Sequence, residues 1–179
     1  MRRFRNILLL LLGLNFLSSG LDFNSSALAK RIQKRMNKEI TSVFSVENFT
    51  LESSTIKIKQ TPFLINYSLQ EIKVDNQLQG YAFLGTAPSK TDTFEYLVLF
   101  DPTFIIKKAS VLVYREDYGG EIASKRWLSQ FVNKQDKSTF VYGDNISAIS
   151  GATISVQSMT TSMNHVFSSL KQVTAGEGK

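Results

Sequence analysis

The segment with the clearest chemical potential is a run of small and hydroxyl-bearing residues before the last apolar-periodic stretch. It reads Ser147-Ala-Ile-Ser-Gly-Ala-Thr-Ile-Ser155. Gly151 permits a tight, left-handed turn, and small side chains at Ser150 and Ala152 leave room for a ligand against the main chain. Because a helix N-terminus presents free N–H groups and a positive dipole end, the segment is typical of an anion site. The alternative is an ordinary helix N-cap, where Ser and Thr are preferred.

Residue counts exclude several other chemistries. The chain of 179 residues has no cysteine, which excludes disulfides, thiolate metal sites and cysteine nucleophiles. A single histidine, His165, excludes a multi-histidine metal centre. No G-x-S-x-G pattern marks a hydrolase nucleophile, so a secreted Ser-His-acid hydrolase is disfavoured. We predict no metal site and expect any redox chemistry to come from a bound group.

The residues around Thr153 resemble the signature of a known family. Ser150-Gly-Ala-Thr153, followed by Ile154, Ser155 and an amphipathic stretch, is similar to the motif of the FMN-binding domain family. That family includes the covalently flavinylated subunits of the bacterial sodium-translocating quinone reductase and of the Rnf electron-transport complex. Its pattern is Asp-x-x-Ser/Thr-Gly-Ala-Thr, and the last threonine carries FMN through a phosphoester bond. The resemblance implies FMN on Thr153, with non-covalent FMN as the alternative.

Upstream motifs extend the resemblance to about residues 75–173. Residues 96–113 are similar to the family's strand–turn–strand core, 116–120 occupy the place of its Glu-Thr-Pro-Gly loop, and 125–131 match its next helix. The aromatic residues Tyr118, Trp127 and Tyr142 are candidates to pack on the flavin ring, and Lys125 and Arg126 are candidate phosphate partners, with core packing and solvated charges as the alternatives. The resemblance implies a cofactor site of Thr153, Ser150, Gly151, Ala152, Ser155, Glu116, Tyr118, Gly119 and Gly120.

One position departs from the family pattern. The family's aspartate lies six residues before the threonine, where this chain has Ser147, and Asp144 lies three residues earlier. In the family that aspartate belongs to the motif read by a flavin transferase, which moves FMN from FAD with Mg²⁺. The resemblance implies a flavoprotein for electron transfer between unidentified redox partners, matured by a flavin transferase. A binding or structural module of the cell envelope with a degenerate flavin site is the alternative.

Hydrophobic periodicity predicts the elements that hold this site. Residues 27–44 and 154–173 follow a helical period, and Ile122–Val132 also favours a helix. Strand signals cover Tyr67–Val74, Leu78–Leu84, Phe94–Phe100 and Phe104–Tyr114, and a short strand is predicted at Phe140–Tyr142. The turn signal at 101–103 predicts an antiparallel hairpin. We therefore predict an α+β fold, with an antiparallel β-sheet and flanking α-helices, as one FMN-binding-like domain at 61–173.

The amino terminus predicts export. Three arginines precede the apolar run Ile7–Leu17, which is short for a membrane span and typical of a signal peptide. We assign residues 1–29 to this peptide, with cleavage after Ala29 and an uncleaved anchor as the alternative. Either reading predicts an extracytoplasmic protein, periplasmic or secreted, with or without membrane attachment. Residues 30–60 are expected to form a basic amphipathic helix and an extended lead-in, and 174–179 a frayed tail.

The distribution of charge bears on partners. The formal net charge is +6, and all of it lies in residues 1–39, whereas residues 40–179 are neutral overall. The domain therefore lacks the basic surface typical of nucleic-acid binding, and no nucleic-acid partner is predicted. The basic face of residues 30–39 is either a solvated helix face or a contact with an anionic membrane surface.

Overall fold

The computed structural model describes residues 22–134 and 139–176. The predicted signal peptide therefore lies largely outside the described residues. In chain order the described elements are α1 (Asp22–Phe44), β1 (Thr50–Ser53), β2 (Asn66–Val74), β3 (Gln77–Pro88), β4 (Thr93–Phe100), β5 (Ile106–Val113), the 3-10 helix η1 (Gly120–Ala123), α2 (Lys125–Leu128), the 3-10 helix η2 (Ser129–Phe131) and α3 (Thr153–Gly176).

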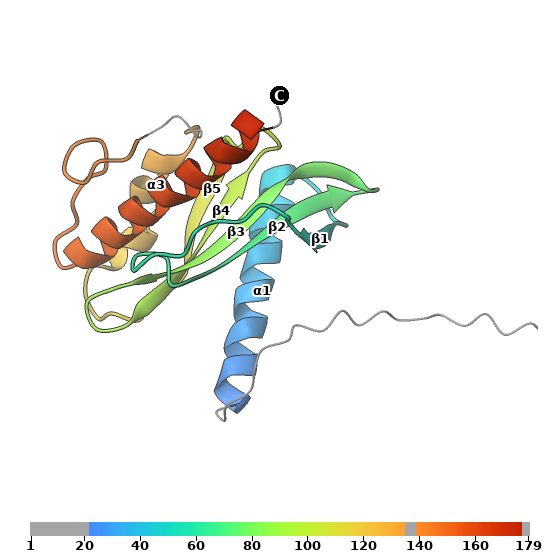
Figure 1. Cartoon of the computed structure of the whole chain (residues 1–179). Coiled ribbons are helices and arrows are strands. Elements are labelled where there is room, and N and C mark those ends of the chain that lie inside the picture. The colour runs from blue at the N-terminus through green and yellow to red at the C-terminus, as the bar shows by residue number, and fades with distance from the viewer. Residues whose placement is uncertain (1–21, 135–138, 177–179) are drawn as a thin grey trace, which may run out of the picture.

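The strands form a single antiparallel sheet in the order β1-β2-β3-β4-β5, so each strand pairs with its neighbour in the chain. Helix α1 lies against one face of this sheet and α3 against the other, as Figure 1 shows. Helices packed on an antiparallel sheet define the α+β class. The predicted fold class is confirmed.

Strand β4 shows why the sheet is covered on both sides. Its side chains alternate, as the period of two in a strand requires. Phe94, Tyr96, Val98 and Phe100 pack in the core under α3, whereas Leu97 and Leu99 pack with α1. A strand with apolar residues on both faces is stable only between two layers.

Helix α1 packs through the apolar stripe that its sequence predicts. Met36 and Ile40 are buried against Ile72, Leu97, Leu99 and Leu112, and Ile32, Val43 and Phe44 pack around them. These contacts begin at Ile32, so a chain that starts at Lys30 keeps all of them. Among the described residues, no helix has the length and apolar character needed to span a membrane.

Helix α3 is fixed to the sheet by buried hydroxyl groups as well as by apolar packing. The Tyr96 hydroxyl on β4 is hydrogen-bonded to Ser162 Oγ on α3, and both side chains are fully buried. Burial raises the pKa of Tyr96, so this hydroxyl stays neutral. Near the start of α3, Tyr114 Oη and Ser155 Oγ lie 3.1 Å apart. The two pairs fix the height and rotation of α3 over the sheet.

Two predicted elements are wrong. Residues 122–132 do not form one helix, because Ser124 is extended (φ −72°, ψ 140°) and its hydroxyl caps a new helix by accepting from the Trp127 N–H. Residues 140–142 are not a strand, because side-chain amides replace the ladder. Asn164 accepts from the Phe140 N–H and donates to its carbonyl, and Asn145 accepts from the Val141 N–H.

The predicted turn between β4 and β5 is confirmed. Asp101 Oδ1 accepts hydrogen bonds from the N–H groups of Thr103 and Ile105, at 2.9 and 3.0 Å. An aspartate that binds the backbone ahead of it is the expected chemistry of such a turn.

The buried hydroxyl pair predicts a stability effect. Ser162→Ala leaves the Tyr96 hydroxyl without its partner in the core, which costs about 1–3 kcal/mol in the free energy of unfolding. Urea denaturation measures this loss. Adding Tyr96→Phe removes the orphaned hydroxyl and recovers part of it. Ser168→Ala, at an exposed position of α3, is the control. A Ser162→Ala protein as stable as the wild type would contradict the prediction.

Candidate functional site

Three segments far apart in the sequence meet near the start of α3. They are the hairpin turn 89–92 between β3 and β4, the loop 114–120 after β5, and the turn 149–152 before α3. Lys90, Tyr114, Glu116 and the residues from Gly151 to Ser155 line one cavity between them, with a volume of about 190 Å³. This cavity contains the threonine that the sequence singles out.

The loop after β5 packs directly on the turn before α3. Gly119 has φ +75°, and a Cβ atom placed on it would lie 2.4 Å from the Ala152 Cβ. Two carbon atoms that are not bonded to each other do not approach this closely. Glycine is therefore required at position 119 both for the positive φ and for the contact with Ala152. Gly120 is different, because a Cβ there would meet no atom within 4 Å. Of the two predicted loop glycines, Gly119 alone makes the close approach.

Tyr118 lies beside this contact and is mostly exposed. A Cβ atom placed on Gly151 would lie 3.3 Å from the Tyr118 Cβ, and Gly151 itself has φ +78°. Tyr118 is 78% exposed, and Ile154, next to Thr153, is 45% exposed. Two large side chains at the surface thus lie near the start of α3, Tyr118 beside Gly151 and Ile154 next to the exposed Thr153.

Glu116 ties the loop to the hairpin turn. Its carboxylate accepts from the Thr91 N–H at 2.7 Å, the Thr91 hydroxyl at 2.9 Å and the Asp92 N–H at 3.3 Å. The pKa of Glu116 is lowered to about 2 by the Ser89 hydroxyl and by these donors. Ser89 Oγ forms no hydrogen bond in the structure. The hydrogen bonds from Thr91 and Asp92 are therefore the main cause of the lowered pKa of Glu116. Glu116 therefore acts as a charged clamp.

Arg115 reinforces the same connection. Its guanidinium donates to the Thr93 carbonyl at 2.7 Å and forms an ion pair with Glu95 at 2.8 Å. The ion pair raises the pKa of Arg115. Two consecutive residues thus hold the hairpin of β3 and β4 to the chain that leaves β5. Lys90, in that hairpin turn, is thereby kept at the cavity.

The start of α3 has donors but no capping side chain. Thr153 is its first residue, and Val156 N–H already bonds to the Ala152 carbonyl at 2.9 Å, so Ala152 is the N-cap. Alanine has no side-chain acceptor, and the first N–H groups of a helix have no partner within it. The site therefore offers N–H donors and the positive dipole end to an anion. This arrangement differs from the plain Ser/Thr cap that the sequence also allowed.

The three hydroxyls around the turn have different surroundings. Thr153 and Ser150 are exposed. Ser155 is 2% exposed and bonded to Tyr114. Ser155 is therefore a structural residue of α3. Thr153 combines exposure with a place in the cavity, and Ser150 is not among the residues that line it.

Four predicted contact residues lie elsewhere. Trp127 is buried and donates from Nε1 to the Ser147 carbonyl at 2.8 Å, so it holds the loop before the turn from inside the core. Tyr142 packs against the core. Lys125 and Arg126 line two other cavities. The structure does not place these four side chains at Thr153.

Ser147, at the position of the family's aspartate, is not among the residues that line the Thr153 cavity. It lines a second cavity of about 340 Å³ together with Arg126, Trp127 and Gln130. Its N–H donates to Gln130 Oε1 at 2.8 Å. The departure from the family pattern therefore changes a neighbouring surface and leaves the walls of the Thr153 cavity intact.

Two residues that line the cavity, Lys90 and Tyr114, were not among the predicted site residues. Lys90 belongs to the turn-like stretch Pro88-Ser-Lys-Thr-Asp92, and Tyr114 reads as the end of a strand. The turn-like composition of this stretch predicts that Lys90 is exposed. It does not predict that the turn lies at the start of α3, because that position depends on the order of the strands in the sheet. Among the described residues, no group of three or more His, Cys, Asp or Glu is placed to hold a metal ion.

Residues 90–168 match the family model of the FMN-binding domain. The match spans the end of the hairpin turn, β4, β5, the loop, the 150–153 turn and most of α3. The family resemblance inferred from the sequence is confirmed, and it indicates a flavin-binding protein. No curated protein matches the chain.

The close approach of Gly119 yields a stability prediction with a matched control. Gly119→Ala puts a side chain at positive φ, which costs about 1–2 kcal/mol, and also displaces Ala152. Gly120→Ala introduces a methyl group into open space and is expected to be close to neutral. Urea denaturation of the two variants measures the difference. Equal stabilities would contradict the packing of this loop on the turn.

The lowered pKa of Glu116 predicts a pH dependence. A carboxyl group with a depressed pKa stabilises the fold above its unfolded pKa, here about 4.5, and that stabilisation is lost as the pH falls toward 2. Wild type should therefore be more stable than Glu116→Gln at pH 6, and the difference should shrink by pH 3. Denaturation midpoints at the two pH values measure this. A difference that stays constant or grows on acidification would contradict the clamp.

Proposed function

Because residues 90–168 form an FMN-binding domain by family, we propose that this protein is an extracytoplasmic electron-transfer flavoprotein with FMN phosphoester-linked to Thr153. The observation that carries the proposal is the position of Thr153. It is exposed, it is the first residue of a long helix without a capping side chain, and it shares a cavity with Lys90. No other exposed hydroxyl of the 150–153 turn meets all three conditions.

The cavity fits the phosphate end of the cofactor. A phosphodiester on Thr153 keeps one negative charge, which the helix dipole favours by about 0.3–1 kcal/mol. Lys90 supplies a cation. Glu116 also lines the cavity, and its carboxylate is bonded to the Thr91 and Asp92 donors. Among the described residues Lys90 forms no ion pair, so its ammonium group is available to the phosphate.

The small size of the cavity favours a covalent attachment. Pockets that hold small molecules by contact alone usually measure about 300–1,000 Å³, whereas this cavity measures about 190 Å³. It is large enough for only part of an FMN molecule, so the ring of a bound FMN would lie toward the surface. Tyr118 and Ile154 provide an apolar border there. A covalent bond retains a cofactor that the pocket does not enclose.

The residues of the site indicate which roles belong to the cofactor and which to the protein. FMN supplies the redox chemistry, and the protein supplies position and electrostatics. The Thr153 hydroxyl would form the linkage, and Lys90 and the first N–H groups of α3 would hold the phosphate charge. The exposed Tyr118, next to Gly151, would shield one edge of the ring. This account needs no catalytic side chain of the protein.

Attachment requires a flavin transferase as a partner. In that reaction the Thr153 oxygen bonds to the FMN phosphorus of FAD, the pyrophosphate bond breaks, AMP leaves and the hydroxyl proton is released. Ser147 lies on the neighbouring cavity wall, so its effect is expected on recognition by the transferase. Replacement of the family's aspartate also favours the second candidate, a cell-envelope module that binds no flavin.

Location and membrane contact complete the proposal. The amino-terminal pattern of three arginines before an apolar run supports a location outside the cytoplasm. In α1, Lys30, Arg31, Lys34 and Lys38 are exposed, and this basic face suits an anionic membrane surface. Arg35 is also exposed, but its guanidinium donates to the Leu112 carbonyl on β5 and so contacts the sheet.

In-gel fluorescence after denaturation tests the linkage. The protein is co-expressed with a flavin transferase of the family, and wild type is expected to give a fluorescent band that Thr153→Ala loses and Thr153→Ser keeps. Lys90→Met should label several-fold more slowly, since it removes the phosphate partner. Lys38→Met, on the opposite face of the sheet, should label at the wild-type rate.

The same experiment separates the candidate functions. Wild type without a band that still takes up FMN on titration would contradict the covalent linkage alone. Wild type that neither labels nor binds FMN would favour the module without flavin. If Ser147→Asp then restores labelling, the loss lies in recognition by the transferase and not in the Thr153 cavity.

A further inference from the structure

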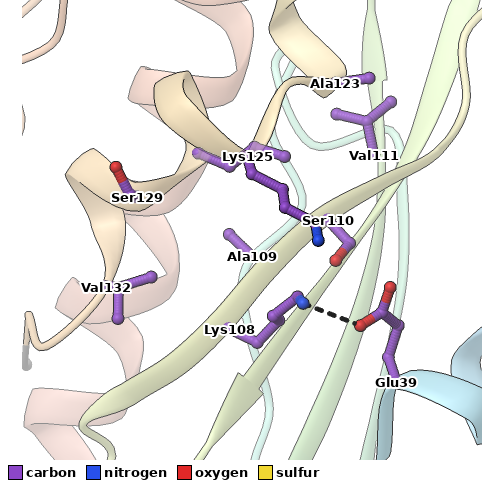
Figure 2. A pocket seen from close by; sticks show the side chains of 10 residues that line it. Glu39, Lys108, Ala109, Ser110, Val111, Ala123, Lys125, Ser129 and Val132 are labelled. Atoms are coloured by element: carbon purple, nitrogen blue, oxygen red, sulfur yellow. Dashed lines mark ion pairs between the residues drawn. The ribbon is translucent and has the colours of Figure 1, made fainter. Parts of the chain in front are cut away.

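A separate cavity of about 290 Å³ lies between α1, β5 and α2. Figure 2 shows its lining side chains. None of them lines the Thr153 cavity. The residues around it are Glu39, Lys108, Ala109, Ser110, Val111, Ala123, Lys125, Leu128, Ser129 and Val132.

One of the two lysines that line this cavity has no ionic partner among the described residues. Lys108 on β5 forms an ion pair with Glu39 on α1 at 3.1 Å. Lys125 forms no ion pair among the residues that the structure describes, and Figure 2 shows it reaching from α2 toward Ser110 on β5. The lining therefore has a net charge of +1. The Lys125 ammonium group, which has no ionic partner in the described part of the chain, lies near Ser110, a residue that is 8% exposed.

Apart from Ser129, whose hydroxyl donates to the Arg126 carbonyl, the remaining lining residues are apolar. Ala109 and Leu128 line the cavity and are buried, at 4% and 5% exposure. Val111, Ala123 and Val132 complete the lining. A few polar groups that converge over an apolar surface are the usual make-up of a small-molecule site.

We propose that this cavity binds a small monocarboxylic acid with an apolar body. The carboxylate pairs with the Lys125 ammonium and accepts from the Ser110 hydroxyl, and the body lies on Ala109 and Leu128. A single negative charge matches the net +1 of the lining. A dianion such as phosphate ester would meet the carboxylate of Glu39 and leave the apolar walls unused. The site is independent of the proposed flavin on Thr153.

The test uses 4-fluorobenzoate as the probe and follows its fluorine NMR signal as protein is added. Saturable broadening with one site per chain is expected. The neutral analogue 4-fluorobenzyl alcohol should bind at least about fivefold more weakly, because it lacks the charge that Lys125 pairs with. Thr153→Ala should bind the probe as wild type does, which separates this site from the flavin proposal.

Three variants decide the role of the charges. Lys125→Met should weaken binding at least about fivefold, whereas Lys107→Met, an exposed neighbour on β5 outside the cavity, should change it less than twofold. Glu39→Gln should tighten binding, because it removes a repelling carboxylate and frees Lys108. No saturable broadening, equal affinity for the neutral analogue, or equal weakening by Lys107→Met would overturn the proposal.

Discussion

The contact between Gly119 and Ala152 is the constraint on which the site depends. It joins the loop after β5 to the residue that caps α3, and it tolerates no side chain at position 119. Through this contact the end of a β-strand sets the position of a helix N-terminus. Glu116 and Arg115, a few residues earlier, tie the same loop to the hairpin turn that bears Lys90. One short loop thus brings the cation, the helix end and Thr153 together.

The sheet makes this arrangement rigid. Its strands are covered by α1 on one face and α3 on the other, so the hairpin and the helix are both anchored in packed layers. Two hydroxyl pairs fix the rotation of α3: Tyr96 with Ser162, which is buried, and Tyr114 with Ser155, which is partly buried. Because the rotation is fixed, Thr153 is exposed at the cavity, whereas Ser155, two residues later, is buried and bonded to Tyr114. The exposed threonine is a consequence of helix packing.

The sequence predicts those elements of the fold that depend on local residue patterns. Alternation identified β2 to β5, the period of 3.6 identified α1 and α3, and the small residues of 150–153 marked the turn. Local patterns do not reveal which turns share an end of the sheet, so Lys90 was missed. They also mislead where side chains override the backbone pattern. Ser124 splits one expected helix by capping a new one, and Asn164 replaces an expected strand ladder.

The central element of the proposed function is that Thr153 carries FMN. Peptide mapping by mass spectrometry of the protein matured with a flavin transferase tests it most directly, because Ser150, Thr153 and Ser155 fall in one region and differ in exposure. The account predicts one FMN phosphoester, on Thr153, with Ser150 and Ser155 unmodified. A flavin on Ser150 or Ser155, or a fully matured protein with an unmodified Thr153, would contradict it.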